Sequence, residues 1–253
     1  MANTANISVL SLLIASSLVA VSLIFSYSQK LKLEKEIVIG VIRAIIQLVI
    51  LGYVLDFIFG LKNPLFTTFL LLFMTINAAY NAAKRGKGIE KGFLISFISI
   101  TVGTIITLGV LISAGAVKYV PNQVIPISGM IISNAMVALG LCYRQMISLF
   151  KNKREEVETK LALGADIMVS SKEIIKDSIK TGMLPTIDST KTLGIVAIPG
   201  MMSGLIIAGT PPLQAIRFQI MVTFMMLSTT SIASFLACYL SYSRFFNDRK
   251  QLK

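Results

Sequence analysis

The chain has 253 residues, of which 55% are hydrophobic and only 14% are charged, and its formal net charge is +12. Soluble proteins average about 25% charged residues, whereas several stretches here are long and apolar enough for a helix of roughly 20 residues to cross a bilayer. The composition therefore excludes most soluble enzymes and predicts an all-α, polytopic transmembrane helical bundle. The chain contains no histidine, which also excludes His-based zinc proteases, Ser-His-Asp hydrolases and His-ligated haem.

Apolar stretches in chain order predict about seven spans within a single transmembrane domain over residues 1–253. They are Ile7–Ser28, Ile37–Gly60, Leu65–Ala83, Gly92–Gly115, Val124–Cys142, Leu193–Ala208 and Ile216–Leu240. Cys142 and Cys238 lie in apolar stretches without the spacing of a metal site, so we expect both to be buried hydrophobic residues.

Basic residues near the membrane ends predict the orientation, because cytoplasmic loops retain Lys and Arg. With the N-terminus outside and the C-terminus in the cytoplasm, 20 of the 24 Lys and Arg residues fall on cytoplasmic segments. The positive charge is therefore explained by topology in a multi-pass protein of the inner (plasma) membrane, in contact with lipid. Nucleic acid is not an expected partner.

The polar segment from Ser148 to Thr192 predicts two short amphipathic helices on the cytoplasmic side. The first covers LFKNKREEVETKLALGA and ends at Gly164, a residue suited to a left-handed helix stop. In the second, Ser170 and Glu173 have the spacing of a capping box, and Gly182 with Pro185 closes the helix.

This segment is either a solvated connector or a coupling element that fits a groove on a partner protein. The step from Glu158 to Gly164 in ETKLALGA is similar to the EAA loop of ABC-transporter permeases, although Val157 and Thr159 stand where that loop has alanines. The candidate coupling residues are Glu158, Leu161, Gly164 and Ala165.

A wider set of motifs resembles one family. The motifs are RAIIQLVILGYVLDFIF (43–59), NAAYNAAKR (77–85), QVIPISGMIISNAMVALGLCY (123–143), KLALGA (160–165) and GMLPTIDSTKTLGIVAIPGMMSGLIIAGTPPLQAIRFQIMVTFMMLS (182–228). They resemble the FetB family of iron-export permeases in bacterial ABC transporters, which is also similar to plant aluminium-tolerance permeases. The resemblance implies a homodimeric permease joined by two copies of a separate ATPase subunit, with iron or another metal ion as the exported cargo.

The chain lacks a GxxxxGK[ST] phosphate loop, so we expect it to be a non-catalytic subunit without a cofactor, and ATP with Mg to bind the partner ATPase. Two alternatives stay open, an ABC permease for a non-metal cargo and a secondary transporter driven by an ion gradient. The second is disfavoured because no carboxylate is predicted near the bilayer midplane.

Polar groups and a helix break within the spans are the candidates for a transport pathway or gate. These candidates are Arg43, Gln47, Asn77, Asn81, Asn134, Asp188, Pro199, Gly200, Met201 and Met202. Each also has an ordinary explanation: snorkelling for Arg43, hydrogen bonding between helices for the asparagines, helix capping for Asp188, and packing for the methionines. The residues that would bind a metal ion are not identified by these patterns.

Overall fold

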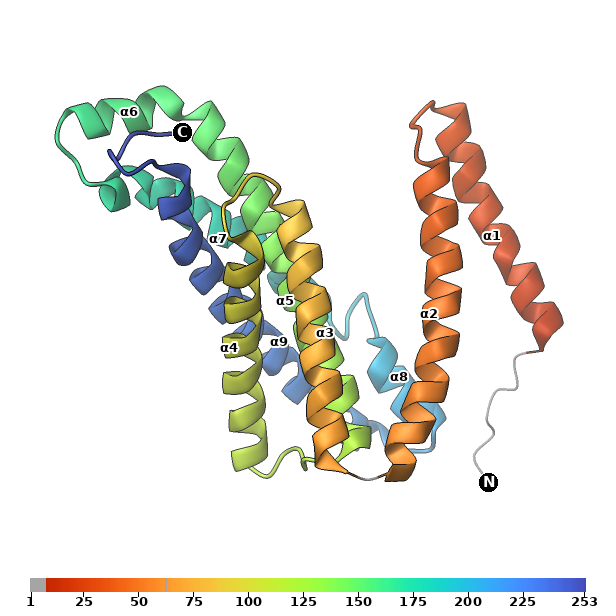
Figure 1. Ribbon diagram of the computed structural model, residues 1–253. Coiled ribbons are helices and arrows are strands. Elements are labelled where there is room, and N and C mark those ends of the chain that lie inside the picture. Colours follow the sequence, from red (N-terminus) through yellow and green to blue (C-terminus); the bar gives the residue numbers. More distant parts are fainter. Residues whose placement is uncertain (1–7, 62) are drawn as a thin grey trace. The chain divides into compact units, whose positions relative to one another are not determined.

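The computed structural model describes residues 8–61 and 63–253, and helices make up most of them (Figure 1). Apart from two isolated β-bridges, the regular structure of the described residues is helical, which confirms the predicted all-α class. The helices are α1 (Val9–Ser28), α2 (Glu34–Leu61), α3 (Pro64–Arg85), α4 (Gly92–Ser113), α5 (Pro121–Asn152), α6 (Arg154–Ala162), α7 (Ile167–Thr192), α8 (Gly200–Ile207), α9 (Pro212–Ser241) and the 3-10 helix η1 (Tyr242–Phe245).

The chain divides into two compact units, of which the first contains α1 and α2 together with Ile207–Gly209. The hydroxyl of Ser26 donates a hydrogen bond to Glu34 Oε1 (2.8 Å) and accepts one from the backbone N–H of Leu33 (3.2 Å), so the turn between α1 and α2 is fixed. The single domain predicted over residues 1–253 stays a prediction.

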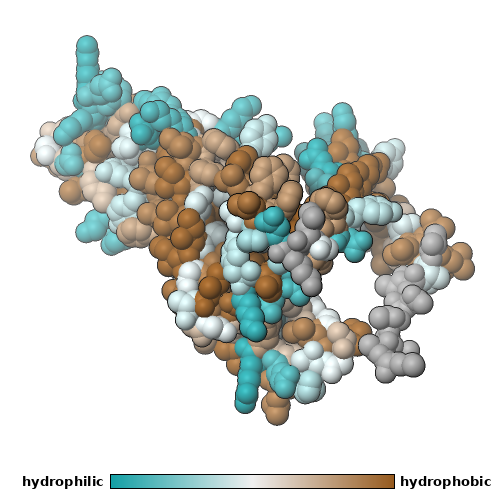
Figure 2. Space-filling model, turned by 60° about the horizontal axis from the view of Figure 1, so that its bottom comes forward, coloured by the Kyte–Doolittle hydropathy of each residue, from teal (hydrophilic) through white to brown (hydrophobic). Residues whose placement is uncertain are grey.

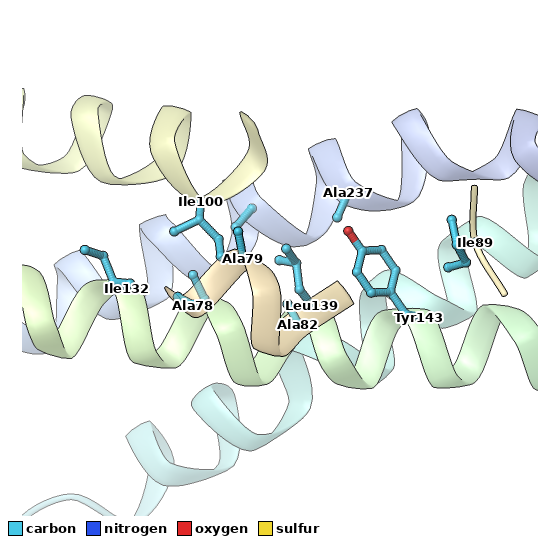
Figure 3. Close-up of a cluster of buried hydrophobic side chains, with 11 residues drawn as sticks. Ala78, Ala79, Ala82, Ile89, Ile100, Ile132, Leu139, Tyr143 and Ala237 are labelled. Atoms are coloured by element: carbon cyan, nitrogen blue, oxygen red, sulfur yellow. The ribbon is translucent and has the colours of Figure 1, made fainter. Parts of the chain in front are cut away.

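The second unit, residues 63–206 and 210–253, is a helix bundle built around α5. Helix α5 packs against α3, α7 and α9, and α4 packs against both α3 and α9. Figure 3 shows part of the core, where the small side chains of Ala78, Ala79 and Ala82 on α3 let the helix backbones approach closely. The fully buried Tyr143 of α5 shares a hydrogen bond with Ser96 of α4 (2.9 Å), which satisfies its hydroxyl inside the bundle.

Helix α7 corrects the prediction for the segment from Ser148 to Thr192. Instead of closing at Gly182 and Pro185, the helix runs through both residues to Thr192. Gly182 does not end the helix because it is the point of closest contact with α5: a Cβ there would lie against Cys142 Sγ and 2.9 Å from the carbonyl oxygen of Ala138. The helix therefore packs along the bundle instead of projecting from it.

The two ends of α7 also differ from the predicted caps. Helix α7 begins at Ile167 with Asp166 as its N-cap, so Ser170 and Glu173 lie inside the helix and form no capping box. Asp188 lies within the last turns of α7 and pairs with Lys191 (3.0 Å), so it does not cap a following span.

The predicted span Leu193–Ala208 is not one helix. Residues 193–199 form a turn, in which the carbonyl of Thr192 accepts hydrogen bonds from Val196 and Ala197, and the helix resumes as α8 only at Gly200. Pro199 cannot donate a backbone hydrogen bond, and its carbonyl accepts one from the N–H of Ser203 in the first turn of α8 (3.0 Å). The break expected at Pro199–Gly200 is therefore confirmed, whereas the full-length span is wrong.

Six helices of the described residues are long and apolar enough to cross a membrane, namely α1 to α5 and α9. Hydrophobic side chains are spread widely over the exposed surface in Figure 2, as expected for helices that face lipid. In the second unit, α3, α5 and α9 end at the side where α4 begins, and α6 and the C-terminus lie there as well (Figure 1). The basic loops of the topology prediction thus gather at one end of this unit.

The tight contact at Gly182 leads to a stability prediction. We expect Gly182→Ala to lower the free energy of unfolding by about 1–3 kcal/mol, because the added methyl group overpacks the contact with α5. Unfolding in detergent, followed by the loss of helical circular dichroism, measures the change. Gly109→Ala is the matched control, since a Cβ at Gly109 meets no atom within 4 Å and should leave stability unchanged or slightly raised. Equal stability of the two variants would contradict the packing described here.

Candidate functional site

The four predicted coupling residues lie together on the surface. Glu158, Leu161, Gly164 and Ala165 all line one groove of about 820 Å³ at the end of α6. Gly164 has φ of +88°, so it forms the predicted left-handed stop after the helix. The preceding Leu163 is 82% exposed, which leaves a large apolar side chain beside the groove.

Helix α6 is short and polar, and its position depends on a few local contacts. Arg154 pairs with Glu158 (2.8 Å) and Lys160 with Glu156 (2.6 Å), each four residues apart on the exposed surface. Val157 is buried in the core cluster that also contains Ile174 and Ile175 of α7. The helix is thus attached to the bundle by one side and presents its charged side to solvent.

The C-terminal tail, residues 246–253, forms the other wall of the groove. Asn247, Arg249, Lys250, Gln251 and Leu252 line it. Arg154 donates hydrogen bonds to the carbonyl oxygens of Lys253 (3.3 Å) and Leu252 (3.4 Å), so the first residue of α6 holds the tail directly. Phe246 and Leu252 are buried and face one another in a β-bridge.

Two further ion pairs tie the tail to neighbouring loops. Lys250 Nζ lies 3.1 Å from Asp166 Oδ1, and Lys253 Nζ lies 2.6 Å from Glu90 Oε1 in the α3–α4 loop. The hydrogen bond and positive charge of Lys253 lower the pKa of Glu90, and the hydrogen bond from Lys250 lowers the pKa of Asp166. Sequence reasoning missed the tail because its basic residues also fit the topology, and nothing local indicates their distant partners.

A second candidate site is a partly open cavity of about 190 Å³ where α5, α7, α8 and α9 meet, with Ser189 and Gly200 exposed at its edge. Pro199, Gly200 and Met201, all predicted for the pathway, line it. The other lining residues, which sequence reasoning did not single out, are Met130, Thr186, Ser189, Thr190, Leu193, Gln219, Val222, Thr223 and Met226. The helix break thus borders a cavity, which is the setting in which broken helices occur within membranes.

The other predicted pathway residues do not line this cavity. Met202, which follows Met201 in the sequence, is half-buried. Asp188 is exposed and forms an ion pair with Lys191. The side-chain amide of Asn134 donates to the carbonyl of Met130 within its own helix (2.8 Å).

The remaining candidates lie on exposed faces of α2 and α3. Asn81 donates to the side chain of Asn77 (2.8 Å) on α3, while Arg43 and Gln47 are exposed on α2 in the first unit. Within the second unit, the structure therefore places Pro199, Gly200 and Met201 at one cavity but not the polar residues of α3 and α5.

Comparison with known proteins identifies the family of this chain. The model of the uncharacterised protein family UPF0014 matches residues 9–246. The chain belongs to the UPF0014 family. Within it, the chain is 51% identical to the protein named probable iron export permease protein FetB of Escherichia coli K12, over 99% of this chain and 96% of that protein.

More distant UPF0014 members cover nearly the whole chain as well. The protein ALUMINUM SENSITIVE 3 of Arabidopsis thaliana is 37% identical over 94% of this chain and 88% of its own length. The membrane protein YjkA of Bacillus subtilis is 37% identical over 96% of this chain and 98% of its own length. No solved structure matches the chain. The resemblance to FetB and to a plant aluminium-related protein is confirmed, and the chain is a membrane protein of this family.

The paired carboxylates of the tail predict a dependence on pH. Because pairing lowers the pKa values of Glu90 and Asp166, the stabilisation of the tail is complete above the ordinary carboxyl pKa of about 4. It is lost as the pH falls through the lowered values. We expect amide hydrogen exchange in residues 247–253, measured by mass spectrometry and corrected for intrinsic rates, to accelerate over that range.

The double variant Glu90→Gln, Asp166→Asn should show the faster exchange already at neutral pH. Glu173→Gln is the control, because Glu173 pairs only with Lys176 of its own helix in the described residues. Unchanged exchange of the tail in the double variant would show that these ion pairs do not hold it.

Proposed function

We propose that this chain is the transmembrane subunit of an ABC exporter of metal ions, with iron as the first cargo to test. The observation that carries the proposal is the 51% identity, over nearly the full length, to a protein named as a probable iron export permease. The groove formed by α6 and the tail supports it, because a permease driven by a separate ATPase needs a shaped surface on which that subunit docks. ATP and Mg would bind the partner, and this chain would catalyse no reaction.

Helix α7 supplies a mechanical connection for such coupling. Its N-cap, Asp166, lines the groove, and Thr186, Ser189 and Thr190 near its other end line the cavity in the bundle. The helix has 26 residues, a length of about 39 Å at the usual rise. A displacement of α6 by the ATPase would therefore reach the cavity through one continuous helix.

The proposed assembly contains two copies of this chain and two ATPase subunits. Gly204 of α8 supports contact between copies, since a Cβ there meets no atom of the described chain within 4 Å and such positions allow helices to approach closely. We propose an inner-membrane orientation with the N-terminus outside and the groove in the cytoplasm. The basic loops at the groove end of the second unit support that orientation.

Coupling should depend on the helix stop at Gly164. A β-branched residue at φ +88° is strained by about 1–3 kcal/mol, which corresponds to about a 5- to 150-fold change in an equilibrium. We expect Gly164→Val to reduce the ATPase rate of the purified complex by at least several-fold and to weaken co-purification of the ATPase subunit.

The matched control is Gly115→Val in the α4–α5 loop. Gly115 has φ of +69° and open space around it, but it lies at the opposite end of the bundle from α6. This variant carries the same kind of strain and should keep its ATPase coupling. Equal losses in both variants would mean that strain alone, and not the groove, explains the effect.

The cargo is tested in cells that express this chain together with its ABC ATPase partner, identified by co-purification. We expect cellular iron, measured by mass spectrometry after iron loading, to fall when both proteins are present. It should not fall when the phosphate-loop lysine of the ATPase is replaced, or with Glu158→Lys in this chain. Unchanged iron in cells that contain an intact, ATP-hydrolysing complex would contradict iron export and favour a non-metal cargo.

A further inference from the structure

The cavity where α5, α7, α8 and α9 meet is lined by an uncommon set of donor atoms. Three of its residues are methionines from three different helices: Met130 of α5, Met201 of α8 and Met226 of α9. Gln219 contributes an amide. The described residues that line the cavity include no Asp, Glu, Lys or Arg, so its surface is electrically neutral.

Among the described residues that line the cavity, Gln219 is the one with a buried side-chain atom that makes no hydrogen bond. Its Oε1 atom is buried and makes no hydrogen bond with any described residue, although buried amide oxygens normally have a partner. Neighbouring hydroxyls are already occupied: Thr190 donates to the carbonyl of Thr186 (2.8 Å) and Thr223 to the carbonyl of Gln219 (2.9 Å). A residue that lines the cavity thus carries a buried amide oxygen that no described residue satisfies.

The two helices that end at the cavity do not determine whether it favours a bound cation or a bound anion. Residues in the last turn of α7, including Ser189 and Thr190, border the cavity, as do Gly200 and Met201 in the first turn of α8. The negative end of one helix dipole and the positive end of the other therefore oppose one another. Any preference of the cavity for a cation or an anion must therefore come from its side chains.

Thioether sulfur is a soft donor that prefers soft ions of low charge, whereas hard and highly charged ions require carboxylate oxygens. A trivalent ion in a neutral cavity within the membrane would also lack the charges that offset its lost hydration. We propose that the cavity is a binding site for a soft, low-charge metal cation, ligated by the thioethers of Met130, Met201 and Met226 and by the amide oxygen of Gln219. The proposal rests on the proposed function and specifies its cargo site. Such donors accept the ferrous ion but not the ferric ion, and monovalent copper or silver fits them best.

Silver(I) is the probe, because it is soft, monovalent and stable in air. The purified full-length chain in lipid nanodiscs, with Cys142→Ala and Cys238→Ala to remove competing thiols, is titrated by isothermal calorimetry. We expect one tightly bound Ag⁺ per chain. Met201→Leu, Met226→Leu and Gln219→Leu should each weaken that affinity by about tenfold or more, while Fe³⁺ should not displace the silver.

Two neighbouring methionines provide matched controls. Met202 follows Met201 on α8, and Met225 precedes Met226 on α9, yet neither lines the cavity. Met-to-Leu exchange nearly conserves volume, so the methionine variants should fold. Thermal unfolding checks the fold of these variants and of Gln219→Leu. Met202→Leu and Met225→Leu should bind silver as the background protein does.

Absence of tight silver binding in the background protein, or equal losses in lining and control variants, would overturn the proposed site. If iron export and ATPase coupling persist while silver does not bind, this inference alone fails. If silver binds as expected but no complex with an ATPase forms, the proposed function fails and the metal site remains. Measurements on the same set of proteins therefore distinguish a failure of the proposed metal site from a failure of the proposed function.

Discussion

The close contact between α7 and α5 at Gly182 is the constraint on which the second unit depends. Helix α7 carries several charged residues between Lys172 and Lys180 and is not among the helices apolar enough to span a membrane. It joins the bundle through a face that combines Ile174 and Ile175 with small residues. On that face Ser171 and Ser178 donate to the carbonyls of Ile167 (2.6 Å) and Ile174 (2.7 Å), so these hydroxyls need no partner on another helix. The buried face thus stays compatible with an apolar core while the opposite face remains charged.

This packing gives α7 a role at both candidate sites. The groove and the cavity lie near opposite ends of one helix, and a continuous helix transmits displacement along its axis with little loss. Pro185 removes one backbone hydrogen bond within α7, which makes that turn the most deformable part of the connection. Coupling between the sites would then depend on contacts that hold α7 against α5 and α9.

The two sites differ in their electrostatics because they lie in different surroundings. The groove contains charges of both signs, such as Arg154, Glu158 and Lys250, on an exposed surface where ion pairs are weak and can exchange partners. The cavity is lined by hydroxyl, amide and thioether groups, which are less costly than charges inside a membrane. If the groove docks an ATPase as proposed, exchangeable charges would suit it, and if the cavity holds a cation as proposed, neutral donors would bind that cation without trapping it.

The sequence by itself determined the helical membrane class, the gathering of basic loops at one end and the helix stop at Gly164, because hydropathy, charge and glycine conformation are local properties. It also indicated the break at Pro199–Gly200, since proline lacks a backbone donor. Only the tertiary structure decided that α7 continues through Gly182, because glycine ends a helix in solvent but allows close approach when another helix lies against it. Two further features join residues that are far apart in the sequence: the contact of Arg154 with the C-terminal tail, and the cavity lined by Met130, Gln219 and Met226. No local pattern encodes which distant partners will pack together.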